Sequence, residues 1–231
     1  FSMYETVAPF TAENGYAMAG SYLNGEVVDS MGGGICQVST TLYNAVLRAE
    51  LEVVERSPHS MTVHYVELSE DAAIAGTYKD FKFKNSTDYP IYIEGYTTSD
   101  KKITFNIYGK ETRDSNRSIS FESVLVNEVK PNTILRDDAG QGLGYKNVSA
   151  GKTGYVAELY KIVKVNGVQT DRIKINKSTY KGSDRVVTYG TAGDPTLSEN
   201  LRAAIAAQDE ALADANVAAA NAAAAAAAPA Q

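Results

Sequence analysis

Residues 31–49 read MGGGICQVSTTLYNAVLRA, and this stretch decides the fold of the N-terminal part of the chain. Its apolar residues recur at helical spacing, which predicts a helix over residues 36–49 with one face in a core: Val38, Leu42, Ala45, Val46 and Ala49. Three glycines run into this helix, and the only cysteine of the chain, Cys36, falls in its first turn or at its cap. The sequence therefore predicts a thiol at a helix N-terminus.

A helix N-terminus is a favourable place for a nucleophilic thiol. The N–H groups of the first turn lack intrahelical partners and carry a partial positive charge, which stabilises a thiolate and can hold an oxyanion. Gly33 and Gly34 leave room for a substrate backbone, and Gln37 and Ser39 add polar side chains. We predict that Cys36 is a nucleophile and that these four residues bind the oxyanion or the substrate. The alternative is a Cys36 that acts as a small buried hydrophobic residue.

A cysteine nucleophile also needs a base, and the chain holds two histidines, His59 and His64. They are five residues apart, so on one strand they would face opposite sides and at most one would reach the thiol. The third, orienting group is left open among Asp71, Asp80 and Asn85. A zinc site needs three or four ligands at a suitable spacing, and the Cys and His pattern does not match one. We therefore predict neither a metal nor a cofactor.

The rest of the chain indicates an α+β fold. A short helix is predicted after Ser2, and strands are predicted over 51–56, 61–68, 81–85, 90–98 and 102–109. The helix that carries Cys36 would then pack on an antiparallel sheet in a first domain, residues 1–115. Residues 116–191 predict a small all-β domain whose Asn166-Gly167 pair is a hairpin turn. Residues 192–231 form an Ala-rich tail, predicted to be helical or disordered.

Composition limits the class of protein. A hydrophobic fraction of 44% is typical of a globular chain, and the mild formal net charge of -6 argues for neither nucleic acid nor an anionic membrane as a partner. We therefore predict no nucleic-acid partner. No apolar run approaches the roughly 20 residues that a membrane-spanning helix needs. Since residue 1 is Phe, we expect an export signal or anchor to precede this sequence, and a membrane to be a partner only through such an anchor.

Two longer stretches resemble the VanW family. These are GGGICQVSTTLYNAVLRAELEVVERSPHSMTVHYV and DAAIAGTYKDFKFKNSTDYPIYIEGY, and the likeness covers about residues 1–110. The resemblance implies an extracellular enzyme of Gram-positive bacteria, in a family implicated in L,D-transpeptidation of peptidoglycan. It places the nucleophile on Cys36, the motif histidine on His59 and the orienting acid on Asp71. Arg56 lies in the same motif as His59 and is expected to bind substrate.

A second resemblance covers residues 118–191, on GKTGYVAELYKIVKVNGVQTDRIKINKSTYKGSDRVVTYGT. This stretch resembles the G-five domain, which implies a module of wall enzymes and adhesins that binds amino-sugar polymers. The net charge of residues 116–191 is +5, which would suit anionic wall polymers, although salt screens such an attraction.

These observations predict an extracellular, cell-wall-associated L,D-transpeptidase that works through a cysteine acyl-enzyme. Its partners would be peptidoglycan stem peptides and wall glycans. Two alternatives stay open: a cysteine peptidase or carboxypeptidase of the wall, and a non-catalytic wall-binding or adhesion module.

Overall fold

The computed structural model describes residues 1–23 and 26–227, and the chain divides into two compact units. The first unit comprises residues 1–128 together with 154–181, and the second comprises residues 129–153 and the chain from residue 182 onward. The division therefore falls inside the predicted all-β segment, and part of that segment belongs to the same compact unit as the N-terminal region.

The first unit begins with a short helix and a hairpin. Helix α1 (Met3–Val7) starts where the Ser2 side chain accepts a hydrogen bond from the Glu5 N–H, a typical N-cap. After the 3-10 turn η1 (Ala12–Asn14), strands β1 (Met18–Leu23) and β2 (Glu26–Met31) pair antiparallel. The sequence analysis did not predict this hairpin.

Helix α2 (Ile35–Arg48) is the centre of the first unit and carries Cys36 at its second residue. Its inward side chains join the main core, where each buried large apolar side chain stabilises the fold by about 1.5–3 kcal/mol: Leu42, Tyr43, Val46 and Leu47. The helix contacts two antiparallel pairs of strands, formed by β3 (Glu52–Glu55) with β4 (Lys82–Lys84) and by β5 (Tyr92–Thr97) with β6 (Ile103–Tyr108).

The strand predicted over residues 61–68 is wrong. The chain between β3 and β4 has no strand and runs as turns and irregular segments. Met61 and Val63 are buried as a strand pattern would suggest, but the main chain finds partners other than a neighbouring strand. The Glu67 carbonyl accepts from the Glu70 N–H at 3.1 Å, and the Leu68 carbonyl accepts from the Ser123 hydroxyl at 2.7 Å. The two histidines therefore do not alternate on a common strand.

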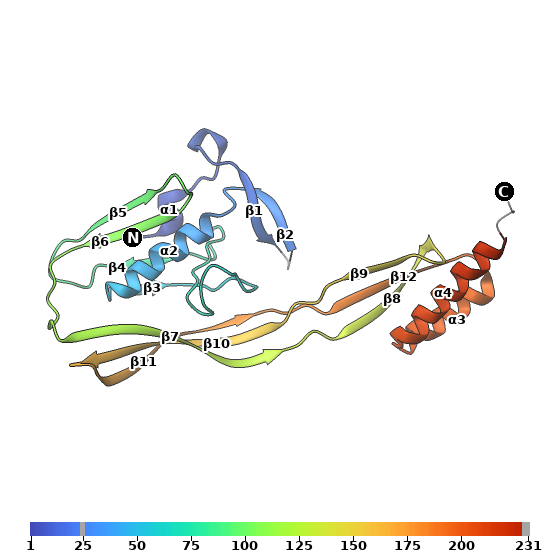
Figure 1. The fold of residues 1–231 in the computed structure, drawn as a ribbon. Coiled ribbons are helices and arrows are strands. Elements are labelled where there is room, and N and C mark those ends of the chain that lie inside the picture. The colour runs from blue at the N-terminus through green and yellow to red at the C-terminus, as the bar shows by residue number, and fades with distance from the viewer. Residues whose placement is uncertain (24–25, 228–231) are drawn as a thin grey trace. The chain divides into compact units, whose positions relative to one another are not determined.

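Three long strands complete the first unit: β7 (Arg117–Val129), β10 (Gly154–Val165) and β11 (Val168–Tyr180). They form one sheet in the order β11-β10-β7 (Figure 1). The predicted hairpin turn is confirmed between β10 and β11, where Asn166 and Gly167 have φ angles of 52° and 78°. Positive φ at both central residues is the geometry that an Asn-Gly turn favours.

The second unit combines a small sheet with two helices. Strand β12 (Arg185–Ala192) lies between β8 (Thr133–Gly142) and β9 (Lys146–Ser149), parallel to the first and antiparallel to the second. Helices α3 (Pro195–Ala206) and α4 (Glu210–Ala227) follow, and Asp194 caps the first of them. Apolar side chains of both helices share a core with this sheet: Leu135, Val187, Tyr189, Leu201, Ala204, Ile205, Ala213 and Val217.

The fold class α+β is confirmed: the pairing is antiparallel for β1 with β2, β3 with β4, β5 with β6, β10 with β11 and β9 with β12, and parallel for β8 with β12. The predicted tail contributes helices that bury apolar side chains, whereas residues 222–226 of its alanine run are exposed. Alanine alone offers little surface to bury, so helix propensity rather than packing accounts for that last stretch.

Candidate functional site

Cys36 lies at the start of α2, where the backbone geometry leaves its own N–H available. Gly34 is the N-cap residue with φ of 90°, a left-handed conformation that favours glycine. The N–H groups of Ile35 and Gln37 donate to the carbonyls of Gly32 and Gly34. Within the described parts of the chain, the Cys36 N–H donates to no main-chain carbonyl beyond its helix. The thiol is half-buried, and its Sγ donates to the Ile74 carbonyl at 3.4 Å.

Gly33 serves the packing of the hairpin beside the helix. A Cβ at this position would lie 2.0 Å from the Ala19 carbonyl oxygen, so only glycine permits β1 to approach so closely. The sequence analysis assigned this glycine to substrate approach. The structure shows a second reason for it, because the close approach makes β1 and β2 one wall of the cavity in front of Cys36.

That cavity has a volume of about 600 Å³, within the usual range for small-molecule sites. Its walls come from the glycine run, the hairpin, the first turn of α2 and the irregular segment between β3 and β4. The polar and reactive groups that line it are Ser21, Ser30, Cys36, Gln37, His59, Ser60, Tyr65, Tyr78 and Lys79. The Cys36 thiol and the His59 imidazole therefore open into the same cavity.

His59 is buried beside the thiol and is held by a carboxylate. Its Nδ1 lies 2.6 Å from Asp71 Oδ2, its backbone N–H donates to the same oxygen at 2.7 Å, and its Nε2 lies 3.5 Å from the Tyr65 hydroxyl. Burial lowers the pKa of His59, but hydrogen bonds to Asp71 and Cys36 and the charges of both outweigh burial and raise it to about 9. A protonated imidazole at neutral pH stabilises a thiolate next to it.

Asp71 is fully buried and has a donor at each carboxylate oxygen. Oδ2 is bonded to the backbone N–H and the ring Nδ1 of His59. Oδ1 accepts from Arg56 Nη2 at 2.8 Å and from the Tyr180 hydroxyl at 2.5 Å. Burial raises the pKa of Asp71, but these donors and the guanidinium charge of Arg56 together lower it below its usual value. The result is a fixed anion that orients the imidazole.

The structure brings most of the predicted site residues together. Cys36 and His59 line the cavity with Gly33, Gly34 and Gln37, and Asp71 supports His59 from behind.

The two remaining predicted binding residues do not line this cavity. Ser39 is fully buried, and its Oγ has no hydrogen-bond partner among the described residues. Arg56 has only 5% of its side chain exposed, and its guanidinium donates to Asp71, Ser69 and Ser178. Arg56 therefore contacts the orienting carboxylate.

The other two candidates for the orienting group lie elsewhere. Asp80 accepts from the Ser2 hydroxyl and the Tyr4 N–H near the chain start, and Asn85 sits in an exposed turn, bonded to Thr87. His64 is exposed and is not among the residues that line the cavity.

Sequence reasoning missed the contribution of strand β11. Tyr180 lies 109 residues after Asp71, and no local pattern indicates that the two meet. The structure shows how the turn before Asp71 meets this strand: Ser69 adopts φ of 69°, a conformation that glycine usually takes, and its N–H donates to the Tyr180 hydroxyl at 2.7 Å. A serine in a glycine-type turn indicates that surrounding contacts hold it there.

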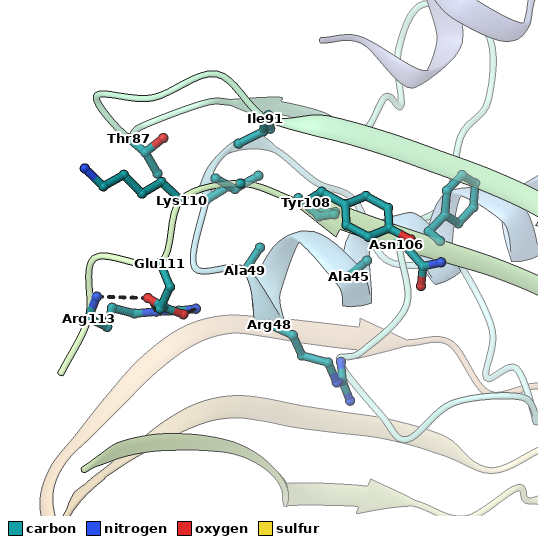
Figure 2. Close-up of a pocket in the computed structure, with 14 residues that line it drawn as sticks. Ala45, Arg48, Ala49, Thr87, Ile91, Asn106, Tyr108, Lys110, Glu111 and Arg113 are labelled. Atoms are coloured by element: carbon teal, nitrogen blue, oxygen red, sulfur yellow. Dashed lines mark hydrogen bonds and ion pairs between the residues drawn. The ribbon is translucent and has the colours of Figure 1, made fainter. Parts of the chain in front are cut away.

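A second cavity, of about 530 Å³, lies at the opposite end of α2 (Figure 2). Ala45, Arg48 and Ala49 line it from the helix, together with residues of β6 and the segment after it. The Glu111–Arg113 ion pair stands at one side of it in Figure 2. None of the predicted catalytic residues lines this cavity. Among the described residues, no three His, Cys, Asp or Glu side chains are grouped to hold a metal ion.

Comparison with known proteins identifies two domains in order. The model of the family described as VanW like protein matches residues 1–108, and that of the G5 domain matches residues 122–192. The chain thus carries a VanW-like domain followed by a G5 domain. This pair of domains points to a cell-wall-associated protein.

Two curated relatives match part of the chain. The chain is 43% identical over 93 residues to the uncharacterized protein YoaR of Bacillus subtilis, covering 40% of this chain and 31% of that protein. It is 29% identical over 115 residues to the vancomycin B-type resistance protein VanW of Enterococcus faecalis, covering 47% of this chain and 41% of that protein. The matched region is thus less than half the length of either relative.

Two solved G5 structures resemble about a third of the chain. The IgA1 protease G5 domain and HP0197-G5 are each 22% identical, with TM-scores of 0.27 and 0.21, and the matches cover 94% and 100% of those chains. Each match covers 33% of this chain. Within the described residues, every helix is too short or too polar to cross a bilayer.

Proposed function

We propose that the VanW-like domain is a cysteine acyltransferase that cross-links peptidoglycan stem peptides, an L,D-transpeptidase. The single observation that carries this proposal is the continuous chain of contacts from Cys36 to His59 to Asp71, with the thiol and the imidazole facing one cavity. A nucleophile, a base and an orienting acid in this order form the arrangement of cysteine-dependent acyl transfer.

The first half-reaction forms an acyl-enzyme. The Cys36 thiolate attacks the carbonyl of the diamino acid in a stem tetrapeptide, the peptide C–N bond breaks, and a thioester C–S bond forms. The imidazolium of His59 gives its proton to the departing amine of the terminal D-Ala. We assign the Cys36 N–H as the donor that stabilises the oxyanion, because it donates to no described main-chain carbonyl beyond its helix.

The second half-reaction releases the product. The side-chain amine of a neighbouring stem attacks the thioester, its proton passes to His59, and the C–S bond breaks to restore the thiolate beside the imidazolium. The new amide joins two diamino acids directly. Water in place of the amine would give a carboxypeptidase from the same site, so the acceptor decides between the two activities.

Incubation with defined disaccharide-tetrapeptides tests this proposal. We expect mass spectrometry to show linked dimers and free D-Ala with the wild-type chain and neither product with Cys36→Ala, whose fold is checked by circular dichroism. Release of D-Ala without dimers would replace the transpeptidase with a carboxypeptidase, and cleavage of existing cross-links would replace it with an endopeptidase. Full activity of Cys36→Ala would end the catalytic proposal.

Chemical labelling separates the enzyme from a wall-binding module. A thiol that faces a cavity beside a protonated imidazole should react with iodoacetamide faster than the same thiol in the denatured chain at equal pH. Labelling that is slow in the native chain and fast only in denaturant would support a structural Cys36 and a non-catalytic role.

A further inference from the structure

We propose that strand β11 of the G5 domain completes the candidate active site, with Tyr180 as a residue that positions the Asp71 carboxylate. This inference rests on the proposed function for its catalytic meaning, but its structural part is independent of any substrate. The observation behind it is a buried hydroxyl of β11 that donates to Asp71 Oδ1 at 2.5 Å.

The face of β11 toward the VanW-like domain is polar at three alternate positions. Side chains alternate across a strand, so Asn176, Ser178 and Tyr180 point to the same side. Ser178 and Tyr180 are only 1% and 2% exposed, whereas Lys177 and Thr179 between them are exposed. Burying polar groups is costly unless they are bonded, so their presence requires specific partners.

Each of these three side chains bonds to a group that holds Asp71 in place. The Ser178 Oγ accepts from Arg56 Nη1 at 2.8 Å, and Arg56 in turn donates to Asp71. The Asn176 Nδ2 donates to the Ser69 carbonyl at 3.0 Å, in the turn that leads into Asp71. Strand β11 therefore contacts the Asp71 carboxylate directly through Tyr180, and indirectly through Arg56 and the turn at Ser69.

Tyr180 has the most direct contact of the three, because its hydroxyl is both an acceptor and a donor of hydrogen bonds around Asp71. It accepts from the Ser69 N–H at 2.7 Å and donates to Asp71 Oδ1. Asp71 uses its other oxygen for His59, so the Tyr180 hydroxyl, together with Arg56, fixes the rotation of the carboxylate about its axis. A catalytic group that is misplaced by even a small distance loses much of its rate advantage, which is why such supports matter.

The G5 domain is thus divided between the two compact units. Strands β7, β10 and β11 belong to the same compact unit as Cys36, while the remaining strands of the matched region belong to the other unit. In the described structure the VanW-like domain does not supply the whole environment of its own carboxylate.

The test compares Tyr180→Phe with a matched control, Tyr189→Phe. Tyr189 is also buried and its hydroxyl also donates to an aspartate, Asp214, at 2.8 Å, but it lies in the second unit. The decisive readout is the pH titration of the His59 ring by NMR in a His64→Gln background, which leaves one histidine signal. We expect Tyr180→Phe to move its midpoint by about half a pH unit and Tyr189→Phe to leave it unchanged.

An unchanged His59 midpoint in Tyr180→Phe would overturn the inference, whatever the activity. Should Tyr180→Phe fail to fold, Ser178→Ala removes the bond to Arg56 and is judged by the same shift of the midpoint. Where the wild-type chain forms dimers, we also expect Tyr180→Phe to lower kcat about tenfold with little change in KM, because positioning acts on the chemical step. If the wild-type chain forms none, the proposed function fails while the titration still decides the role of β11.

Discussion

The two ends of helix α2 differ in how they are capped and in what surrounds them. At the N-terminus, Gly34 caps the helix without a side-chain hydrogen bond, and Cys36 stands beside a cavity. At the C-terminus, the chain closes tightly: the Leu51 N–H donates to the Val46 carbonyl and the Glu50 N–H to the Leu47 carbonyl. We call the first the open end, because Cys36 faces a cavity there, and the second the closed end, because main-chain hydrogen bonds end the helix there, beside the second cavity.

The residue in the left-handed position differs between the two ends, and this difference is informative. Glycine takes that position before the helix, whereas Glu50, with φ of 58°, takes it after the helix. The Glu50 carboxylate bonds to Arg113, Arg117 and Lys161, which come from the segment before β7, from β7 and from β10. These ion pairs offset the strain of a side chain in that conformation, and they tie the helix to the first sheet of the G5 domain.

The largest expected effect is at the open end. His59→Ala removes the proposed base, and we expect kcat/KM for dimer formation to fall by about a thousandfold. His64→Ala is the control, because His64 is exposed and outside the cavity, and it should keep wild-type activity. Equal losses in the two variants would show that His59 has no special role.

Stability should depend on pH through the same residue. The pKa of His59 rises from 6.5 to about 9 on folding, so its contribution is fully present below pH 6.5 and is lost as pH rises through about 9. The lost free energy of unfolding amounts to about 3 kcal/mol. Urea denaturation at a series of pH values should show this decline in the wild-type chain and a smaller one in His59→Gln. Parallel curves for the two would contradict the assigned pairing with Asp71.

At the closed end, the expected effect is on stability alone. Glu50→Gln leaves three cations without their carboxylate, and we expect the free energy of unfolding to fall by about 2 kcal/mol at neutral pH. The pKa of Glu50 is lowered to about 2 by its bonds to Arg117, Lys161 and Arg113, which outweigh burial, so its contribution holds above pH 4.5 and fades as pH falls through about 2.

Two comparisons sharpen the Glu50 result. Glu50→Gly also removes the carboxylate but suits the left-handed position, so it should destabilise less than Glu50→Gln. Both variants should retain wild-type labelling of Cys36 by iodoacetamide, since Glu50 and the thiol lie at opposite ends of one helix. A change in labelling would mean that the ion-pair cluster acts on the site.

The sequence predicted the local features of this helix and missed the distant ones. Apolar spacing indicated a helix over 36–49, and α2 spans Ile35–Arg48. This prediction succeeded because helical periodicity depends on residues that are close together in the sequence. The hairpin of β1 and β2 and the course of residues 56–81 depend on contacts across the fold, which periodicity does not encode. The placement of Asp71 under Tyr180 belongs to the same class, since residues far apart in sequence create it.

The smallest expected effect concerns the left-handed turn that opens the helix. A Cβ at Gly34 would meet no atom within 4 Å, so Gly34→Ala costs only backbone strain, about 1 kcal/mol of unfolding free energy. Cys36 should still be labelled at close to the wild-type rate.

Gly33→Ala is the informative partner of this variant. Its Cβ would lie 2.0 Å from the Ala19 carbonyl oxygen and must push β1 away from the helix, which opens one wall of the cavity. We therefore expect Gly33→Ala to change the labelling rate of Cys36 by more than Gly34→Ala does. Equal rates in both variants would show that the hairpin does not shape access to the thiol, and the open end of α2 would then owe its exposure to the helix start alone.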